Sequence, residues 1–466
     1  MQHPYPAHRS TRAVATKERS IHRPVVWAAV LALAACSASR GEENYPQFLY
    51  DRVAQVAPSA DLPEEWSSTR HVAWKTDVPG LAWASPVVWG DKVFLNTAVT
   101  EGKEKDTKKG LYLDDLNASQ YGKPTNEYRW QVVCLDLNTG TPRWTTTVHQ
   151  GIPPKNHHKK NTLASETPVT DGERVYAYFG NVGLFCLDME GKQLWKYNVP
   201  ITDNRFSWGT SISPILYEDT LYLVNDNDNQ SYLAAIDKRT GKEKWRIDRD
   251  EKANYCTPYL WKNDKRTELV VSGIGKVRSY SLDGQLLWEL GGMCGLAIPT
   301  PFAHDGLLYV TSGHVIMRPR PIFAIKPGAS GNISLSDKAD SNESIVWARK
   351  MDGPYHPTPL VLGDYLYVLY DMGMINAYHL KTGAPLAPKS IRIPRGRAFT
   401  SSPWTYGGKI FCLSEDGVTF VLKPGPSFEV VRTNALEEDD MCMASPAILK
   451  DKLLLRTAKR VYCIAK

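Results

Sequence analysis

The sequence predicts an all-β fold in which eight four-stranded antiparallel sheets form one closed ring, an eight-bladed β-propeller. Three observations predict it: a repeat of fixed period, strand-like segments within each repeat, and matching gaps at the two ends of the array. Each repeat begins with Ser or Thr followed by Pro, and the prolines are Pro86, Pro168, Pro214, Pro258, Pro301, Pro359, Pro403 and Pro446. Successive gaps are 82, 46, 44, 43, 58, 44 and 43 residues. Such a period, lengthened twice by inserts, is typical of stacked structural repeats.

Within each repeat we predict three strands in close succession and a fourth that arrives later. The first strand starts at the Ser/Thr-Pro pair and ends at a turn rich in Gly and Asp, such as Gly90-Asp91 or Asp171-Gly172. These residues tolerate the positive φ of a two-residue hairpin turn. The second strand alternates apolar and aromatic residues, as in Leu221-Tyr222-Leu223, which suits a pleated buried surface. The third strand has a small residue, an aliphatic residue and often Asp, as in Cys134-Leu135-Asp136.

A tryptophan marks the fourth strand in five repeats, at Trp144, Trp195, Trp245, Trp288 and Trp347. The first four follow a turn glycine by four residues: Gly140, Gly191, Gly241 and Gly284. A large flat side chain at a fixed offset indicates packing between neighbouring sheets. The sixth and seventh repeats lack this Trp, so their outer strands near Ile391 and Val430 are predicted from position alone.

The two ends of the array predict how the ring closes. The last repeat has strands near Leu453–Leu455 and Val461–Ile464 but no fourth strand of its own. An extra strand, Val72–Lys75 around Trp74, precedes the first Ser/Thr-Pro pair. Pairing these segments would remove the exposed edges of an open array. An open solenoid is the alternative, and the displaced strand argues against it.

These patterns resemble the pyrroloquinoline-quinone-type (PQQ-like) propeller repeat. The Ser/Thr-Pro start, the small-aliphatic-Asp strand and the Thr-Gly-x-x-x-Trp ending carry the resemblance over roughly residues 65–466. Two groups share this repeat: the soluble quinoprotein dehydrogenases, and non-catalytic lipoproteins resembling BamB, the outer-membrane β-barrel assembly factor. The resemblance implies the fold, but the repeat alone does not choose a function.

Residues 1–35 predict a signal peptide. Five basic residues between Arg9 and Arg23 precede a short apolar run, Val25–Ala35, which is too short to span a bilayer. The run ends in a sequence that resembles a bacterial lipoprotein cleavage site, where Cys36 would be lipidated; an ordinary or uncleaved signal is the alternative. Residues 36–64 are then a linker and residues 65–466 the propeller. We expect an exported protein held by its lipid at the periplasmic face of a bacterial membrane, with the outer membrane favoured.

Charge gives no support for a nucleic-acid partner. The first 35 residues hold five basic groups and one acidic group, so removing their +4 lowers the formal net charge from +6 to +2.

The seven cysteines after Cys36 fall into two sets. Cys134, Cys186, Cys412 and Cys463 occupy strand positions and are expected to be small buried apolar residues. Cys256, Cys294 and Cys442 lie shortly before repeat starts, where a disulfide is an open alternative that the sequence cannot pair.

The candidate binding face is the side of the ring that carries the links into each first strand and the loops between second and third strands. Aromatic and Arg side chains are common anchors of binding surfaces. The predicted face consists of Trp83, Arg205, Trp208, Tyr255, His314, Arg318, Tyr355, His356, Arg397 and Phe399. An insert at about 101–128 belongs to the same side and is either a lid or, the favoured interpretation, a solvated decoration.

The sequence predicts neither a catalytic nor a metal site. Glu166 has no assignable acid–base partner, and the adjacent pair His157-His158 is poorly placed to bind one ion from a strand. The acidic run at 437–440 is predicted to be a solvated loop. We expect no cofactor.

The favoured function is a non-catalytic scaffold that binds envelope proteins, β-barrel assembly components among them, as the resemblance to BamB-like lipoproteins implies. The first alternative is a PQQ-dependent dehydrogenase, which would use the quinone with calcium. That group's vicinal disulfide is absent, and no cation-ligand set is apparent. The second alternative is a polysaccharide-binding propeller, because aromatic side chains at the channel mouth can stack on sugars.

Overall fold

The computed structural model describes residues 44–50, 61–104, 106–111, 117–438 and 440–466. The predicted signal peptide, the lipidation site Cys36 and most of the predicted linker lie outside these residues. Besides strands, the described part contains two short 3-10 helices, η1 (Ala118–Tyr121) and η2 (Arg205–Ser207), and no α-helix. None of its helices is long or apolar enough to cross a membrane.

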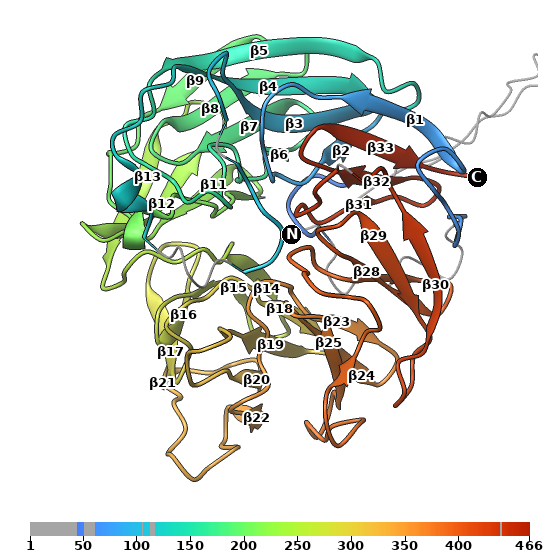
Figure 1. The fold of residues 1–466 in the computed structure, drawn as a ribbon. Helices are drawn as coiled ribbons and strands as arrows, with labels where there is room; N and C mark the ends of the chain where they lie inside the picture. The colour runs from blue at the N-terminus through green and yellow to red at the C-terminus, as the bar shows by residue number, and fades with distance from the viewer. Residues whose placement is uncertain (1–43, 51–60, 105, 112–116, 439) are drawn as a thin grey trace, which may run out of the picture. The chain divides into compact units, whose positions relative to one another are not determined.

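The predicted ring of eight antiparallel sheets is confirmed, and Figure 1 shows the sheets arranged around a common centre. Blade 1 contains β2 (Val87–Trp89), β3 (Lys92–Val99), β4 (Tyr128–Asp136) and β5 (Pro142–Gly151). Blade 2 contains β6 (Val169–Thr170), β7 (Arg174–Phe179), β8 (Gly183–Asp188) and β9 (Gln193–Tyr197). Blade 3 contains β10 (Ile215–Tyr217), β11 (Thr220–Asn225), β12 (Ser231–Asp237) and β13 (Glu243–Arg249). Blade 4 contains β14 (Tyr259–Lys262), β15 (Thr267–Ser272), β16 (Lys276–Tyr280) and β17 (Leu286–Gly291).

The second half of the ring repeats this order. Blade 5 contains β18 (Phe302–His304), β19 (Leu307–Thr311), β20 (Ile322–Ile325) and β22 (Ile345–Arg349); β21 (Gly331–Asn332) adds in parallel to the edge of blade 4. Blade 6 contains β23 (Leu360–Leu362), β24 (Tyr365–Tyr370), β25 (Met374–His379) and β26 (Ile391–Arg392). Blade 7 contains β27 (Trp404–Tyr406), β28 (Lys409–Leu413), β29 (Val418–Leu422) and β30 (Val430–Ala435). Blade 8 contains β31 (Ala447–Ile448), β32 (Leu453–Arg456), β33 (Arg460–Ile464) and, from the front of the chain, β1 (Val72–Asp77).

The ring closes as predicted, because β1 is the fourth strand of blade 8. It pairs antiparallel with β33, and Trp74 lies opposite Cys463. Arg456 on β32 adds a second link to blade 1, donating to the carbonyls of Ala84 and Asn96 at 2.9 and 2.8 Å. This guanidinium is fully buried, and burial lowers its pKa to about 9.

Two residues of the acidic run before blade 8 are structural, which corrects that part of the predicted solvated loop, while Glu438 is exposed. Asp440 is fully buried and accepts hydrogen bonds from the hydroxyls of Thr457 at 2.9 Å and Tyr462 at 2.7 Å. Glu437 pairs with Lys75 on β1 and with Arg460 on β33. Glu437 therefore links the two closing strands.

Apolar side chains fill the space between consecutive sheets. Each of eight buried clusters spans two neighbouring blades, and one of them joins blade 8 to blade 1. The fourth-strand tryptophans pack as predicted: Trp74 donates its indole N–H to the carbonyl of Leu137 in the next blade at 2.8 Å, and Trp347 donates to that of Leu380 at 2.7 Å. A Cβ atom at Gly140 would lie 2.5 Å from the Trp74 ring, so this close approach requires glycine.

The Ser or Thr residues that precede Pro at the start of each repeat form a ring of hydroxyls around the channel, which we call the hydroxyl ring. Six of these residues accept a hydrogen bond on their hydroxyl oxygen from the equivalent backbone N–H of the preceding blade, at 2.9–3.1 Å; the six are Thr167, Ser213, Thr257, Thr358, Ser402 and Ser445. The two remaining members, Ser85 and Thr300, are buried, and their hydroxyls have no hydrogen-bond partner among the residues that the structure describes. The repeat motif therefore links successive blades at the channel wall.

All seven described cysteines are buried and free, so no disulfide links any pair of them. For Cys256, Cys294 and Cys442, this resolves the alternative that the sequence left open.

Candidate functional site

We call the side of the ring that carries the links into the first strands the upper face. The predicted insert lies there, as the β3–β4 loop from Thr100 to Glu127. Its described residues contact other blades of the ring. The Thr107 hydroxyl donates to the carbonyl of Lys159 at 2.8 Å, and Lys109 pairs with Asp416 of blade 7. The insert thus connects blade 1 with blade 7 and with the link to blade 2.

A buried ion pair fixes the insert at its middle. Lys160 Nζ lies 2.6 Å from Glu415 Oε1, and the two side chains are 10% and 2% exposed. Gly110 of the insert joins both partners: its N–H donates to Glu415 Oε2 at 2.7 Å, and its carbonyl accepts from Lys160. Thr400 also donates to Glu415. Because both groups are buried, removing either one would leave an unpaired charge in the interior, which costs more than the loss of a surface ion pair.

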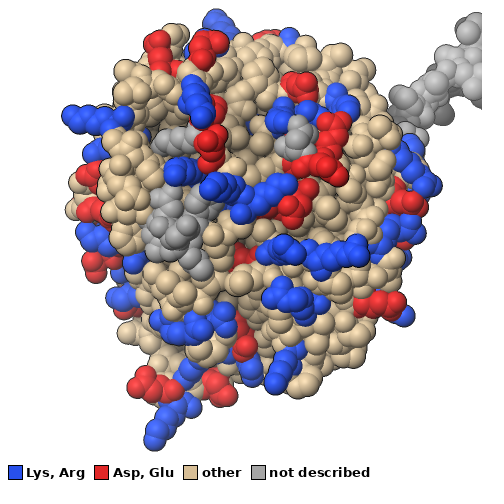
Figure 2. Space-filling view, in the orientation of Figure 1, with Lys and Arg blue, Asp and Glu red and all other residues tan. Residues whose placement is uncertain are grey.

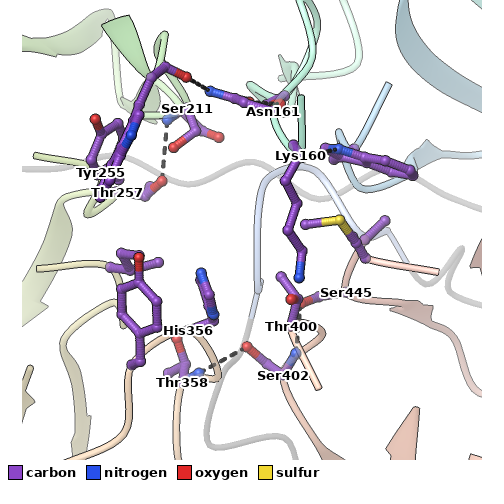
Figure 3. A pocket seen from close by; sticks show the side chains of 18 of the residues that line it. Lys160, Asn161, Ser211, Tyr255, Thr257, His356, Thr358, Thr400, Ser402 and Ser445 are labelled. Carbon is purple, nitrogen blue, oxygen red and sulfur yellow. Dashed lines mark hydrogen bonds between the residues drawn. The ribbon is translucent and has the colours of Figure 1, made fainter. Parts of the chain in front are cut away.

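Beneath the insert lies a cavity of about 240 Å³ at the centre of the ring (Figure 3). Aromatic rings, hydroxyls, and charged or imidazole groups line it, together with four other apolar side chains and one amide: Leu111, Ile298, Met443, Ala444 and Asn161. The aromatic lining consists of Phe48, Trp83, Trp208, Tyr255 and Tyr355. The hydroxyl lining consists of Ser165, Ser211, Ser213, Thr257, Thr358, Thr400, Ser402 and Ser445. The charged and imidazole lining consists of Lys160, His158, His314 and His356.

His356 is held by a buried carboxylate. Asp371 Oδ1 accepts from the His356 backbone N–H at 3.2 Å and contacts the ring Nδ1. A carboxylate accepts hydrogen bonds, so Nδ1 carries the proton and Nε2 is left for the cavity. Figure 3 shows His356 and Lys160 extending into the cavity from opposite sides.

His314 lies in the same wall and is favoured in its neutral form. Burial, reinforced by the neighbouring His356, lowers the pKa of His314. The ring of Tyr355 stands between the two imidazoles, with centroid distances of 4.6 Å to His314 and 3.8 Å to His356. The three rings therefore pack against one another in this wall.

Glu166 occupies a separate buried position between blades 2 and 3. Its carboxylate accepts hydrogen bonds from the Thr210 hydroxyl and from the backbone N–H of Gly180. Burial outweighs these bonds and raises the pKa of Glu166 to about 7. Since Glu166 does not line the cavity, we assign it a structural role.

The structure brings together six of the ten residues predicted for the binding face. Those that line the cavity are Trp83, Trp208, Tyr255, His314, Tyr355 and His356. Arg205 donates to the carbonyl of Gly295, while Arg318 and Arg397 are exposed on the upper face. Phe399 lies elsewhere, in the core between blades 6 and 7, with its ring centroid 5.8 Å from that of Phe420.

Three important residues escaped the sequence analysis: Lys160, Glu415 and Asp371. Glu415 and Asp371 occupy the loops between second and third strands, which the repeat pattern places on the upper face. A search for carboxylates in those loops would have found both.

Arginine and exposed apolar side chains gather on the upper face of blades 5 and 6. Arg320 donates to the carbonyl of Met351, and Arg392 donates to that of Met372, both at 2.8 Å. Ile316, 64% exposed, lies in the same loop as Arg318. We name this surface the Arg–Met arc; it comprises Ile316, Arg318, Arg320, Met351, Met372, Arg392, Arg395 and Arg397. In Figure 2, Lys and Arg side chains extend across the middle of the face of the molecule that is turned toward the viewer.

None of the five arginines of the arc has a carboxylate partner within the described residues. The arc therefore presents guanidinium groups that are available to an external acidic group, beside apolar side chains that a partner could cover.

The comparisons with known proteins identify the family. Residues 129–387 match a family model described as outer membrane protein assembly factor BamB, and the chain belongs to this family of PQQ-like propellers. No curated protein sequence matches it.

One solved structure resembles the chain in fold, and a second aligns more weakly. The crystal structure of BamB from Moraxella catarrhalis aligns with a TM-score of 0.51 at 12% identity, covering 79% of this chain and 98% of that one. A computationally designed protein, Ika8, aligns with a TM-score of 0.47 at 13% identity, covering 74% of this chain and 94% of that one. At these identities the likeness concerns the fold alone.

Proposed function

We propose that the protein is a non-catalytic scaffold of the bacterial envelope that holds other envelope proteins, as its BamB-like family suggests, and that the Arg–Met arc is its docking surface. The partners would include components of outer-membrane β-barrel assembly. Export and anchoring through Cys36 belong to the same proposal. The observation that carries it is the arc itself, where unpaired guanidinium groups adjoin exposed apolar side chains.

The composition of the arc suits protein recognition. Arg and Met are enriched at protein interfaces, whereas Lys and Glu are depleted there. Unpaired guanidinium groups favour a partner with Asp or Glu at the rim of its contact surface, because a bidentate ion pair replaces their hydration. Ile316, Met351 and Met372 would supply the apolar part of the contact.

Cross-linked capture from envelope membranes tests this proposal. The double variant R318E/R397E should reduce partner recovery about tenfold or more, because it places like charges against an acidic rim. The control K192E/K450E makes the same change in charge at two exposed lysines outside the arc. Equal recovery with both double variants would reject the arc as the docking surface.

A quinone-dependent dehydrogenase is the second candidate, favoured only by the central cavity. The residues present fit that cofactor poorly. PQQ bears three carboxylates, whereas the cavity lining has one Lys, already paired with Glu415, and no Arg. No group of three or more His, Cys, Asp or Glu in the described chain is arranged to bind a metal ion. Titration with PQQ and calcium, followed by alcohol-dependent dye reduction, tests this candidate directly.

A further inference from the structure

The hydroxyl ring has unused hydrogen-bonding capacity that faces the central cavity. Five of its members line the cavity: Ser213, Thr257, Thr358, Ser402 and Ser445. Each is at most 6% exposed and uses one lone pair to accept a backbone N–H. None of the five donates its own proton to an acceptor within the described residues. Each hydroxyl thus retains one proton and one lone pair.

The charged groups around the cavity are matched in pairs. Lys160 faces Glu415, and His356 faces Asp371. His314 is favoured as neutral because burial lowers its pKa. An ionic ligand would therefore enter without a dedicated counter-charge, which is costly in a buried site. This lining favours a neutral ligand.

The rest of the lining sets the shape and size of that ligand. Trp83, Trp208 and Tyr355 offer broad apolar surfaces that pack on C–H groups. The cavity volume is about 240 Å³. It is smaller than the roughly 300–1,000 Å³ typical of sites for drug-sized ligands. A single sugar ring or a cyclic polyol has this size, with C–H groups on its faces and hydroxyls around its rim.

We propose that the central cavity is a binding site for a neutral, hydroxyl-rich small molecule of monosaccharide size. The hydroxyl ring exchanges hydrogen bonds with the ligand's hydroxyls, since both partners donate and accept. His356 Nε2 forms a hydrogen bond with one ligand hydroxyl, which can donate or accept, while Asp371 holds the imidazole in place. The aromatic wall packs on the ring of the ligand, and Leu111 of the insert borders the site. This site is distinct from the Arg–Met arc and does not depend on the scaffold proposal.

Calorimetry and tryptophan fluorescence test the site with defined probes. D-glucose, D-galactose, D-mannose and myo-inositol represent neutral polyols, while D-glucuronate and D-glucosamine are charged analogues of the same size. We expect saturable binding of at least one neutral probe, a change in tryptophan emission because Trp83 and Trp208 line the cavity, and an increase in Tm by mass action. The charged analogue of that probe should bind about tenfold more weakly or worse.

Two Thr→Val variants, each at the Thr of a Thr-Pro pair, distinguish an effect on ligand binding from an effect on the fold. Thr358→Val removes a hydroxyl that lines the cavity and should weaken binding about tenfold. Thr300→Val removes a ring hydroxyl that has no hydrogen-bond partner and is not part of the lining, so binding should be unchanged. Circular dichroism checks that both variants fold. If Thr358→Val does not fold, Ser402→Ala is tested in its place. No binding of any neutral probe, tighter binding of a charged analogue, or wild-type affinity in the folded Thr358 or Ser402 variant would overturn the proposal.

Discussion

At the scale of single residues, Glu166 makes stability depend on pH. Its pKa rises from an ordinary value near 4.5 to about 7 in the folded protein. The folded state therefore binds the proton more tightly than the unfolded state, and the stabilisation present below pH 4.5 is lost as the pH rises through 7. A shift of this size corresponds to about 3 kcal/mol at most. We predict that Glu166→Gln removes this loss, as denaturant unfolding of both proteins between pH 4.5 and 8 would show.

The Gln side chain keeps an oxygen that accepts from Thr210 and Gly180, so only the charge is removed. The difference in unfolding free energy between wild type and variant isolates Glu166 from other titrating groups. If that difference stays constant across the pH range, Glu166 does not titrate there.

At the scale of elements, the pair Lys160–Glu415 binds the insert through the backbone of Gly110. Replacing Lys160 with Met leaves a buried carboxylate without its cation, a change that costs about 3 kcal/mol in comparable pairs. We predict that K160M increases deuterium uptake across residues 100–127 and lowers the unfolding free energy. The double variant K160M/E415Q should recover part of the loss, because no unpaired charge remains.

Lys109→Met provides the matched control in the same insert. Its pair with Asp416 is 38% and 44% exposed, and such surface pairs contribute about 0.5 kcal/mol or less. Equal deuterium uptake in the Lys109 and Lys160 variants would mean that the buried pair does not hold the insert.

At the scale of the whole molecule, closure depends on β1. A chain that begins at Val78 would leave the edge of β33 exposed, which favours aggregation. We predict that a peptide of residues 44–77, added in trans, binds this chain and restores a monomer. The same peptide with Trp74→Ala should bind about a hundredfold more weakly, because the indole packs between blades 8 and 1. Size-exclusion chromatography and thermal melting measure both effects, and equal rescue by the two peptides would contradict the role of Trp74.

Most of this architecture could be predicted from the sequence because each blade repeats the same local signals. The Ser/Thr-Pro pair, the hairpin turn and the Trp recur at nearly fixed spacing, and each performs the same task in successive blades. Even the weak outer strands near Ile391 and Val430 were placed correctly from the period alone, as β26 and β30.

The site was less predictable because the residues that contact one another there are distant in sequence or do not follow the repeat pattern. Lys160 and Glu415 are 255 residues apart, and only ring closure brings them together. His356 and Asp371 are 15 residues apart but belong to a link and a hairpin turn that no shared motif connects. Asp440 looked solvated because its neighbours are acidic, yet its hydrogen bonds come from blade 8.

Joining β1 to β33 has a consequence for the order of folding. In the chain, β1 precedes the seven other sheets, whereas its partner strand follows all of them. Those seven sheets can form before the final one, and β1 remains unpaired until β33 is available. Cellular quality control would therefore encounter a nearly folded protein whose last folding step is the pairing of β1 with β33.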